Sequence, residues 1–147
     1  MATDPLDVDG VLGEVEGDAE PWTGLHPDTI LGHMHLHVRN IREAEEFYCG
    51  LIGFELIVRY GGSASFVSAG GYHHHVGFNT WAGVGAPPPP PDAVGLRYFV
   101  VRLPEAAEMK RITARARQAG FQVDETAEGM RLRDPSSNTV VFSAPAR

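Results

Sequence analysis

The stretch GHMHLHVRNIREAEEFYCGLIGFEL, residues 32–56, decides the fold, because its pattern changes from strand to helix and back. Apolar residues alternate with histidines in its first part, which predicts a strand over residues 30–38. Asn40 is a favourable helix N-cap, and apolar residues then recur at helical spacing over residues 41–52. Gly53 predicts the end of that helix.

The rest of the chain repeats this order. Three strand patterns separated by glycine turns follow the first helix, at residues 54–60, 63–70 and 73–79. The second half has a strand, a helix and three strands at residues 95–103, 104–120, 121–126, 129–134 and 138–144. A shift of about 65 residues superposes the halves and places His33 on Tyr98 and His75 near Val141. The repetition predicts an α+β fold of two βαβββ modules.

Composition divides the chain into an arm and a domain. Residues 1–28 are acidic and rich in glycine and proline, which predicts a flexible arm. Residues 29–144 are expected to form a single domain, with modules at about 29–83 and 94–144. The proline-rich stretch at 86–92 between them favours a stiff, extended connector.

Charge and length exclude several classes of protein. The 147 residues are 43% hydrophobic, enough for the core of one domain. The net charge of -7, without a run of lysine or arginine, argues against a nucleic-acid partner. No apolar stretch approaches about 18 residues, so we expect no membrane partner. A single cysteine, and a start without the pattern of a signal peptide, predict a cytoplasmic location.

Six of the seven histidines gather in two clusters, GHMHLHV at residues 32–38 and GGYHHHVGFNTW at residues 70–81. Side chains alternate along a strand, so the apolar residues of the first cluster should face the covering helix. Its histidines should face the open side of the sheet, and these are His33, His35 and His37.

In the second cluster we expect His74 to pack inward with Val76 and Phe78. The residues that should face the open side are His73, His75, Gly77 and Asn79. Two strands would then direct several imidazoles into one cleft. Imidazole is the commonest protein ligand of metals and also titrates near neutral pH, so the pattern predicts a functional cleft.

Two further motifs point to a family. The stretch at 32–56 and LRDPSSNTVVFSA at 132–144 resemble the vicinal oxygen chelate superfamily of glyoxalases, extradiol dioxygenases and bleomycin resistance proteins. FVSAGGYHHHVGFNTWAG at 66–83 and APPPPPDAVGLRYFVVRLP at 86–104 look most like its catechol 2,3-dioxygenase branch. The resemblance covers about residues 28–144 and implies two βαβββ modules forming a curled mixed sheet around a cleft.

The same resemblance implies one divalent metal, such as Fe, Mn, Zn or Ni, bound by the first and last strands of the modules. Carried over to this chain, two ligands fall on His33 and His75. The other two positions fall on Tyr98 and Val141, so the usual ligand set is not kept. Valine cannot coordinate a metal, and neutral tyrosine is a poor ligand.

Two functions follow from the resemblance. As a dioxygenase- or lyase-type enzyme, the chain would use a divalent metal to act on a catechol-like or other vicinal-oxygen substrate. His35 or His73 would supply a third nitrogen, and either is a candidate acid or base in catalysis. As a metal-free protein, it would bind and sequester an aromatic metabolite or drug. The residues expected to line the cleft are Tyr98, Asn79, His37, Phe66 and Trp81.

A small molecule is the expected partner in both cases. Edge strands or the arm could also mediate a homodimer. A hetero-oligomer, in which a second chain supplies the missing ligands, is the third possibility.

Overall fold

The computed structural model describes residues 5–15 and 21–145. Contacts divide the chain into two units, Met1–Ile30 and Leu31–Arg147. The predicted flexible arm, residues 1–28, lies partly outside the described residues, and its flexibility stays a prediction.

In the first unit, residues 5–15 and 21–30 are described and include one short helix, α1 (Val8–Gly13), whose side chains are exposed. The Asp7 side chain accepts a hydrogen bond from the backbone N–H of Gly10, which caps the first turn. No helix within the described ranges is both long enough and apolar enough to cross a bilayer.

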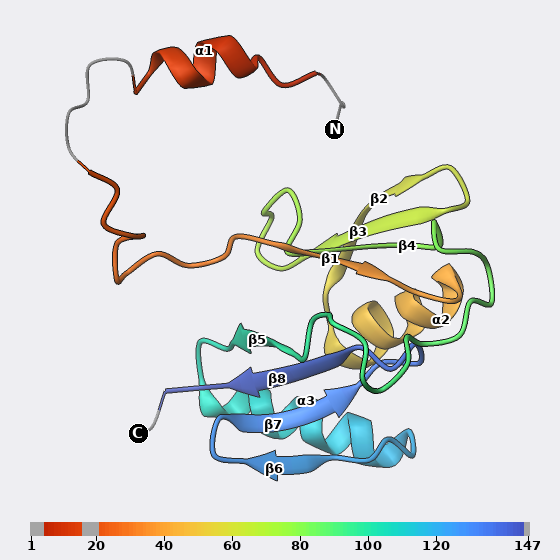
Figure 1. The fold of residues 1–147 in the computed structure, drawn as a ribbon. Coiled ribbons are helices and arrows are strands. Elements are labelled where there is room, and N and C mark those ends of the chain that lie inside the picture. The colour runs from red at the N-terminus through yellow and green to blue at the C-terminus, as the bar shows by residue number, and fades with distance from the viewer. Residues whose placement is uncertain (1–4, 16–20, 146–147) are drawn as a thin grey trace. The chain divides into compact units, whose positions relative to one another are not determined.

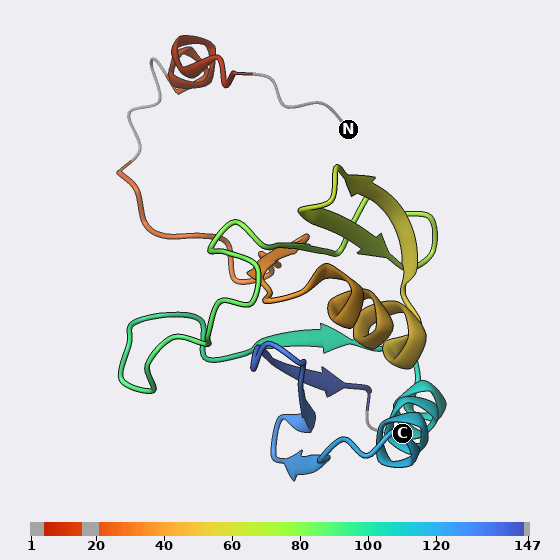
Figure 2. The same cartoon turned by 90° about the vertical axis from the view of Figure 1, so that its right-hand side faces the viewer.

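The second unit contains the two predicted modules (Figures 1 and 2). The first module consists of β1 (Met34–His37), α2 (Ile41–Glu45), η1 (Glu46–Ile52), β2 (Glu55–Tyr60), β3 (Ala64–Ser68) and β4 (Val76–Asn79). The second consists of β5 (Phe99–Arg102), α3 (Ala106–Gln118), β6 (Asp124–Thr126), β7 (Gly129–Arg133) and β8 (Thr139–Ser143). The expected α+β fold of two βαβββ modules is confirmed.

Each module forms its own four-stranded mixed sheet, and the two sheets are not joined into one. The strand orders are β1-β4-β3-β2 and β5-β8-β7-β6. In both sheets the first strand runs parallel to the last, and the other neighbours are antiparallel. This pairing places two strands that are distant in sequence side by side.

The first helix begins where the sequence predicts. The side chain of Asn40 accepts a hydrogen bond from the backbone N–H of Glu43, and Gly53 ends the helix with a φ of 103°. Between them α2 widens into the π-helix η1. Four side chains of η1 are buried. These residues are Phe47, Tyr48, Leu51 and Ile52.

The two modules share one hydrophobic core. Phe47 and Phe78 of the first module pack in the same cluster as Ile112 and Phe142 of the second. The guanidinium of Arg115, on α3, also donates hydrogen bonds to the last carbonyl groups of η1, at 2.7 and 2.9 Å. Arg115 of the second module therefore supplies hydrogen-bond donors to helix-end carbonyl groups of the first module that would otherwise be unpaired.

A turn of the second module, residues 134–138, is bonded to the end of β1. The side-chain amide of Asn138 donates to the carbonyl oxygen of His37 at 3.0 Å. The backbone N–H of Arg39 donates to the hydroxyl of Ser136 at 2.9 Å. Both bonds position the strand that carries the first histidine cluster.

Asp134 holds this turn together. Its Oδ1 accepts from the backbone N–H groups of Ser136 and Asn138, both at 2.8 Å, and its Oδ2 accepts from the Tyr48 hydroxyl at 3.1 Å. Burial raises the pKa of the Asp134 carboxyl, and these hydrogen bonds, which lower the pKa, offset part of the rise. Ser137 follows in the left-handed region, with a φ of 71°.

The Glu45 side chain ties α2 to the first sheet. Its carboxylate accepts two hydrogen bonds from the Arg59 guanidinium, at 2.8 and 2.7 Å, and one from the Ser65 hydroxyl at 2.7 Å. The hydrogen bonds from Arg59 are the main cause that lowers the pKa of Glu45 below its ordinary value.

We expect Ser137→Gly to raise the free energy of unfolding by about 0.5–1 kcal/mol, because glycine adopts a positive φ without strain. Urea denaturation measures the change. Ser137→Ala keeps the Cβ and should not gain this stability. Equal or lower stability of Ser137→Gly would contradict the assignment of backbone strain to this turn.

We expect Glu45→Gln to lower the free energy of unfolding at pH 7 by about 1 kcal/mol, because the charged hydrogen bonds to Arg59 are lost. The folded pKa of Glu45 is depressed, so its contribution is present above the ordinary pKa of 4.5 and is lost as pH falls through the folded pKa. The difference in the free energy of unfolding between variant and wild type should therefore shrink in acid.

Glu46→Gln, at an exposed ion pair with Arg42, is the control and should change stability little at pH 7 or in acid. A pH-independent deficit in Glu45→Gln would refute this explanation.

Candidate functional site

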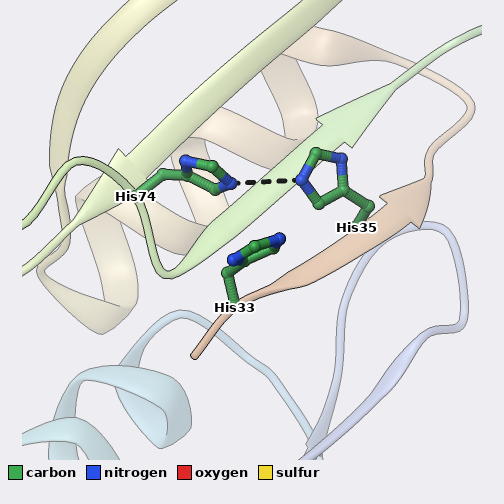
Figure 3. Close-up of side chains that lie close together, drawn as sticks. All are labelled: His33, His35 and His74. Atoms are coloured by element: carbon green, nitrogen blue, oxygen red, sulfur yellow. Dashed lines mark hydrogen bonds between the residues drawn. The ribbon is translucent and has the colours of Figure 1, made fainter. Parts of the chain in front are cut away.

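Three imidazoles meet beside the paired strands β1 and β4. His33 precedes β1, His35 lies in β1, and His74 lies in the turn before β4 (Figure 3). One nitrogen from each of the three rings lies within 4.8 Å of the other two. The Nε2 atoms of His35 and His74 are 3.1 Å apart.

The parallel pairing of β1 with β4 explains this meeting. Met34 lies opposite Val76 and His35 opposite Gly77. The backbone N–H of Met34 donates to the carbonyl oxygen of His75 at 2.9 Å, which extends the pairing back to the turn. The pairing therefore brings the imidazoles of His33 and His35, at β1, close to the imidazole of His74, just before β4.

Burial lowers the pKa of two of the rings and so favours their neutral form. His74 is 7% exposed, and burial followed by the neighbouring His33 lowers its pKa to about 4. Burial, followed again by His33, lowers the pKa of His35. A neutral imidazole has a free nitrogen lone pair, which metal coordination requires.

The donor set fits a bound metal cation. Two donor atoms face each other directly, Nε2 of His35 and Nε2 of His74, whereas the buried Nδ1 of His74, which has no hydrogen-bond partner among the described residues, lies on another side of the ring. Two nitrogens that bind one cation at about 2.1 Å lie roughly 3.0–3.4 Å apart, depending on the bond angle. The separation of 3.1 Å between His35 and His74 suits a shared cation as well as a direct hydrogen bond. His33 completes a set of three nitrogen donors.

His75, the second predicted metal ligand, points elsewhere. Its Nδ1 lies 3.2 Å from the backbone N–H of Ala69 and 3.0 Å from the Ser68 hydroxyl. A backbone N–H can only donate, so Nδ1 accepts and the proton of the neutral ring lies on Nε2. The centroid of the ring lies 4.8 Å from that of Tyr72, with the two planes tilted by 38°, and His75 is not part of the group of three.

His73, a predicted acid or base, lies at the edge of the group. Its exposed ring has its centroid 4.6 Å from that of His74 and 6.2 Å from that of His33. His35, the other predicted acid or base, is one of the three close nitrogen donors.

His74 is buried, as expected, but its ring lies with those of His33 and His35 and not with Val76 and Phe78 in the core. We expected it to pack inward, as part of a strand from residue 73, but β4 begins only at Val76. Gly70 and Gly71 have positive φ values, of 66° and 75°, and the turn they form continues irregularly to the strand. Strand alternation therefore does not apply to the three consecutive histidines, and His74 was missed. The double glycine was the signal that the strand pattern should not be extended.

The observed strand register also corrects the alignment of the modules. The pair His35–Gly77 in the first module corresponds to the pair Val100–Val141 in the second. Gly77, and not His75, is therefore the counterpart of Val141. His33 and Tyr98 occupy equivalent places, each just before the first strand of its module.

Among the residues expected to line the cleft, Phe66 lies against the imidazoles, with its centroid 5.8 Å from that of His35 and 5.2 Å from that of His74. Asn79 is buried and accepts a hydrogen bond from the backbone of Trp81 at 3.1 Å. The structure shows no ring contact between the three imidazoles and either Trp81 or Tyr98. His37 is exposed at the end of β1 and is outside the group of three.

A separate hollow lies between the first helical segment and α3. Its volume is about 610 Å³, and its lining includes Phe47, Leu51, Arg115 and Phe121. No histidine lines it. The three imidazoles, rather than this hollow, carry the groups suited to metal binding.

Comparison with known proteins agrees with the fold. The Glyoxalase/Bleomycin resistance protein/Dioxygenase superfamily matches residues 30–142. A catechol-2,3-dioxygenase of Bacillus subtilis (strain 168) is 46% identical over 142 residues, which are 96% of this chain and 49% of that protein. The chain thus spans about half the length of this curated relative.

Solved structures share the fold at lower identity. A glyoxalase/dioxygenase from Nostoc punctiforme has a TM-score of 0.65 and 12% identity, over 87% of this chain and 100% of that one. Lactoylglutathione lyase from Agrobacterium tumefaciens has a TM-score of 0.58 and 22% identity, over 81% of this chain and 96% of that one. The match of the family model over residues 30–142 shows that the chain belongs to the glyoxalase/bleomycin resistance protein/dioxygenase superfamily.

Proposed function

We propose that the chain is a metal-dependent enzyme that acts on a small molecule with two adjacent oxygen atoms, such as a catechol. The observation that carries the proposal is the group of three imidazole nitrogens within 4.8 Å, formed by His33, His35 and His74. The name of the Bacillus relative supports the substrate class. Because the chain spans half of that relative, both activity and substrate belong to the proposal.

The donor atoms favour certain metals over others. All three donors are imidazole nitrogens, and the group includes no carboxylate. Imidazole suits zinc, nickel, copper and ferrous iron, whereas manganese and magnesium prefer oxygen ligands. Among the metals expected from the sequence, zinc, nickel and iron therefore fit better than manganese.

A cation at this place would polarise the substrate oxygens and stabilise negative charge on them. Phe66, packed against His35 and His74, offers an apolar wall that excludes water from one side. His73 is exposed beside the group, and its ring can hold or release a proton at the edge of the site. A homodimer and a cytoplasmic location stay predictions from the sequence.

We expect the protein, purified without a histidine tag, to bind one Zn²⁺ or Ni²⁺ per chain. His33→Ala, His35→Ala and His74→Ala should each weaken binding at least about tenfold, because each removes one donor. Calorimetric titration and elemental analysis measure affinity and stoichiometry. His37→Ala is the matched control, since this histidine shares β1 but lies outside the group.

His75→Ala separates this site from the ligand pair expected from the family resemblance. The proposal predicts that His75→Ala still binds the cation, whereas His74→Ala loses it. The reverse result would favour the family pair. A chain that binds no cation but takes up aromatic ligands would instead be the metal-free binding protein considered from the sequence.

We expect His74→Leu to raise the free energy of unfolding of the metal-free protein by about 1 kcal/mol. The substitution replaces a buried, incompletely hydrogen-bonded imidazole with an apolar side chain of similar volume. His75→Leu should have the opposite effect, because the Ala69 N–H loses its acceptor and the Ser68 hydroxyl keeps only the Ala69 carbonyl oxygen, at 3.3 Å. Urea unfolding of both variants compares them. A destabilised His74→Leu would show that this imidazole is satisfied within the protein.

A further inference from the structure

We infer that Gly77 is a positioning residue for the imidazole site, and that the absence of its side chain gives the rings of His35 and Phe66 their places. This inference rests on the proposed cation site. It concerns a residue that offers no donor atom and lies at the centre of the sheet beneath the rings.

The space above Gly77 is already filled by its neighbours. A Cβ atom at this residue would lie 3.1 Å from Cε1 of the His35 ring and 3.1 Å from both Cδ1 and Cε1 of the Phe66 ring. Favourable contacts between carbon atoms lie at about 3.5–4.0 Å. A methyl group here would therefore push two rings at once.

The strand register explains why both rings reach this point. β4 lies between β1 and β3, and Gly77 is directly opposite His35 on one side and Phe66 on the other. The two rings lean toward each other over the bare backbone, with centroids 5.8 Å apart. Phe66 also contacts His74, so movement of Phe66 would reach a second ligand.

Backbone conformation does not account for this glycine. Gly77 lies in a paired strand and is not among the glycines with positive φ. A glycine inside a strand costs stability and commonly marks a close approach of another group. The close approach of His35 and Phe66 is the reason that the structure supplies.

The second module provides an internal comparison. Its counterpart of Gly77 is Val141, which lies opposite Val100 on one neighbouring strand and Arg131 on the other. A β-branched side chain occupies the place that the first module leaves empty, and neither neighbour is an imidazole or an aromatic ring. The module with glycine at this position is therefore the one that carries the imidazole group, and the module with valine does not carry it.

The test is the affinity of Gly77→Ala for Zn²⁺, measured by calorimetric titration. We expect at least a tenfold loss relative to wild type. Gly62→Ala is the matched control, because a Cβ there meets nothing within 4 Å and the residue has no positive φ. Its affinity should equal that of wild type. Wild-type protein that fails to bind Zn²⁺ would refute the proposed site, whereas wild-type affinity in Gly77→Ala would refute only the positioning role.

A second variant separates ring crowding from a general effect on the strand. Gly77→Ala/Phe66→Ala removes one of the two crowded rings, and we expect it to bind Zn²⁺ at least threefold more tightly than Gly77→Ala. Histidine ¹⁵N NMR of the metal-free single variant should show shifted His35 and His74 signals and an unchanged His37. If Gly77→Ala does not fold, a folded double variant that binds Zn²⁺ supports the inference. A double variant no better than the single one overturns it.

Discussion

The parallel pairing of β1 with β4 is the constraint on which the candidate site depends. It joins the first and last strands of one module and brings His33 and His35 beside His74, although about 40 residues separate them along the chain. The second module also helps to position β1, because its turn at residues 134–138 forms hydrogen bonds with residues at the end of this strand. The histidine cluster is therefore a product of the whole domain.

The same arrangement places polar groups where burial is unfavourable. His74 is almost fully buried, its pKa is lowered to about 4, and one of its nitrogens has no partner. Such a group costs stability in a protein that does not use it. Gly77 adds a further cost, because glycine weakens a strand. A buried, incompletely bonded imidazole and a glycine inside a strand both cost stability, and such costs at one place are typical of a functional site.

Local patterns in the sequence predicted most of the fold. Asn40 and Gly53 marked the ends of the first helix, and the alternation before Val38 indicated the face on which His33 and His35 lie. The third member of the cluster could not be predicted in this way, because strand alternation holds only within a strand. The turn after Gly70 breaks the pattern, so that His74 rather than His75 joins the group.

The widening of the first helix into η1 and the register that matches Gly77 with Val141 also depend on tertiary packing.

We propose that His33, His35 and His74 bind one cation together. Anomalous diffraction from crystals grown with Zn²⁺, recorded at the zinc absorption edge, tests it most directly. We expect one strong peak about 2.1 Å from a nitrogen of each of these three rings. A peak at His75 without the other three, or no peak near them, would contradict it.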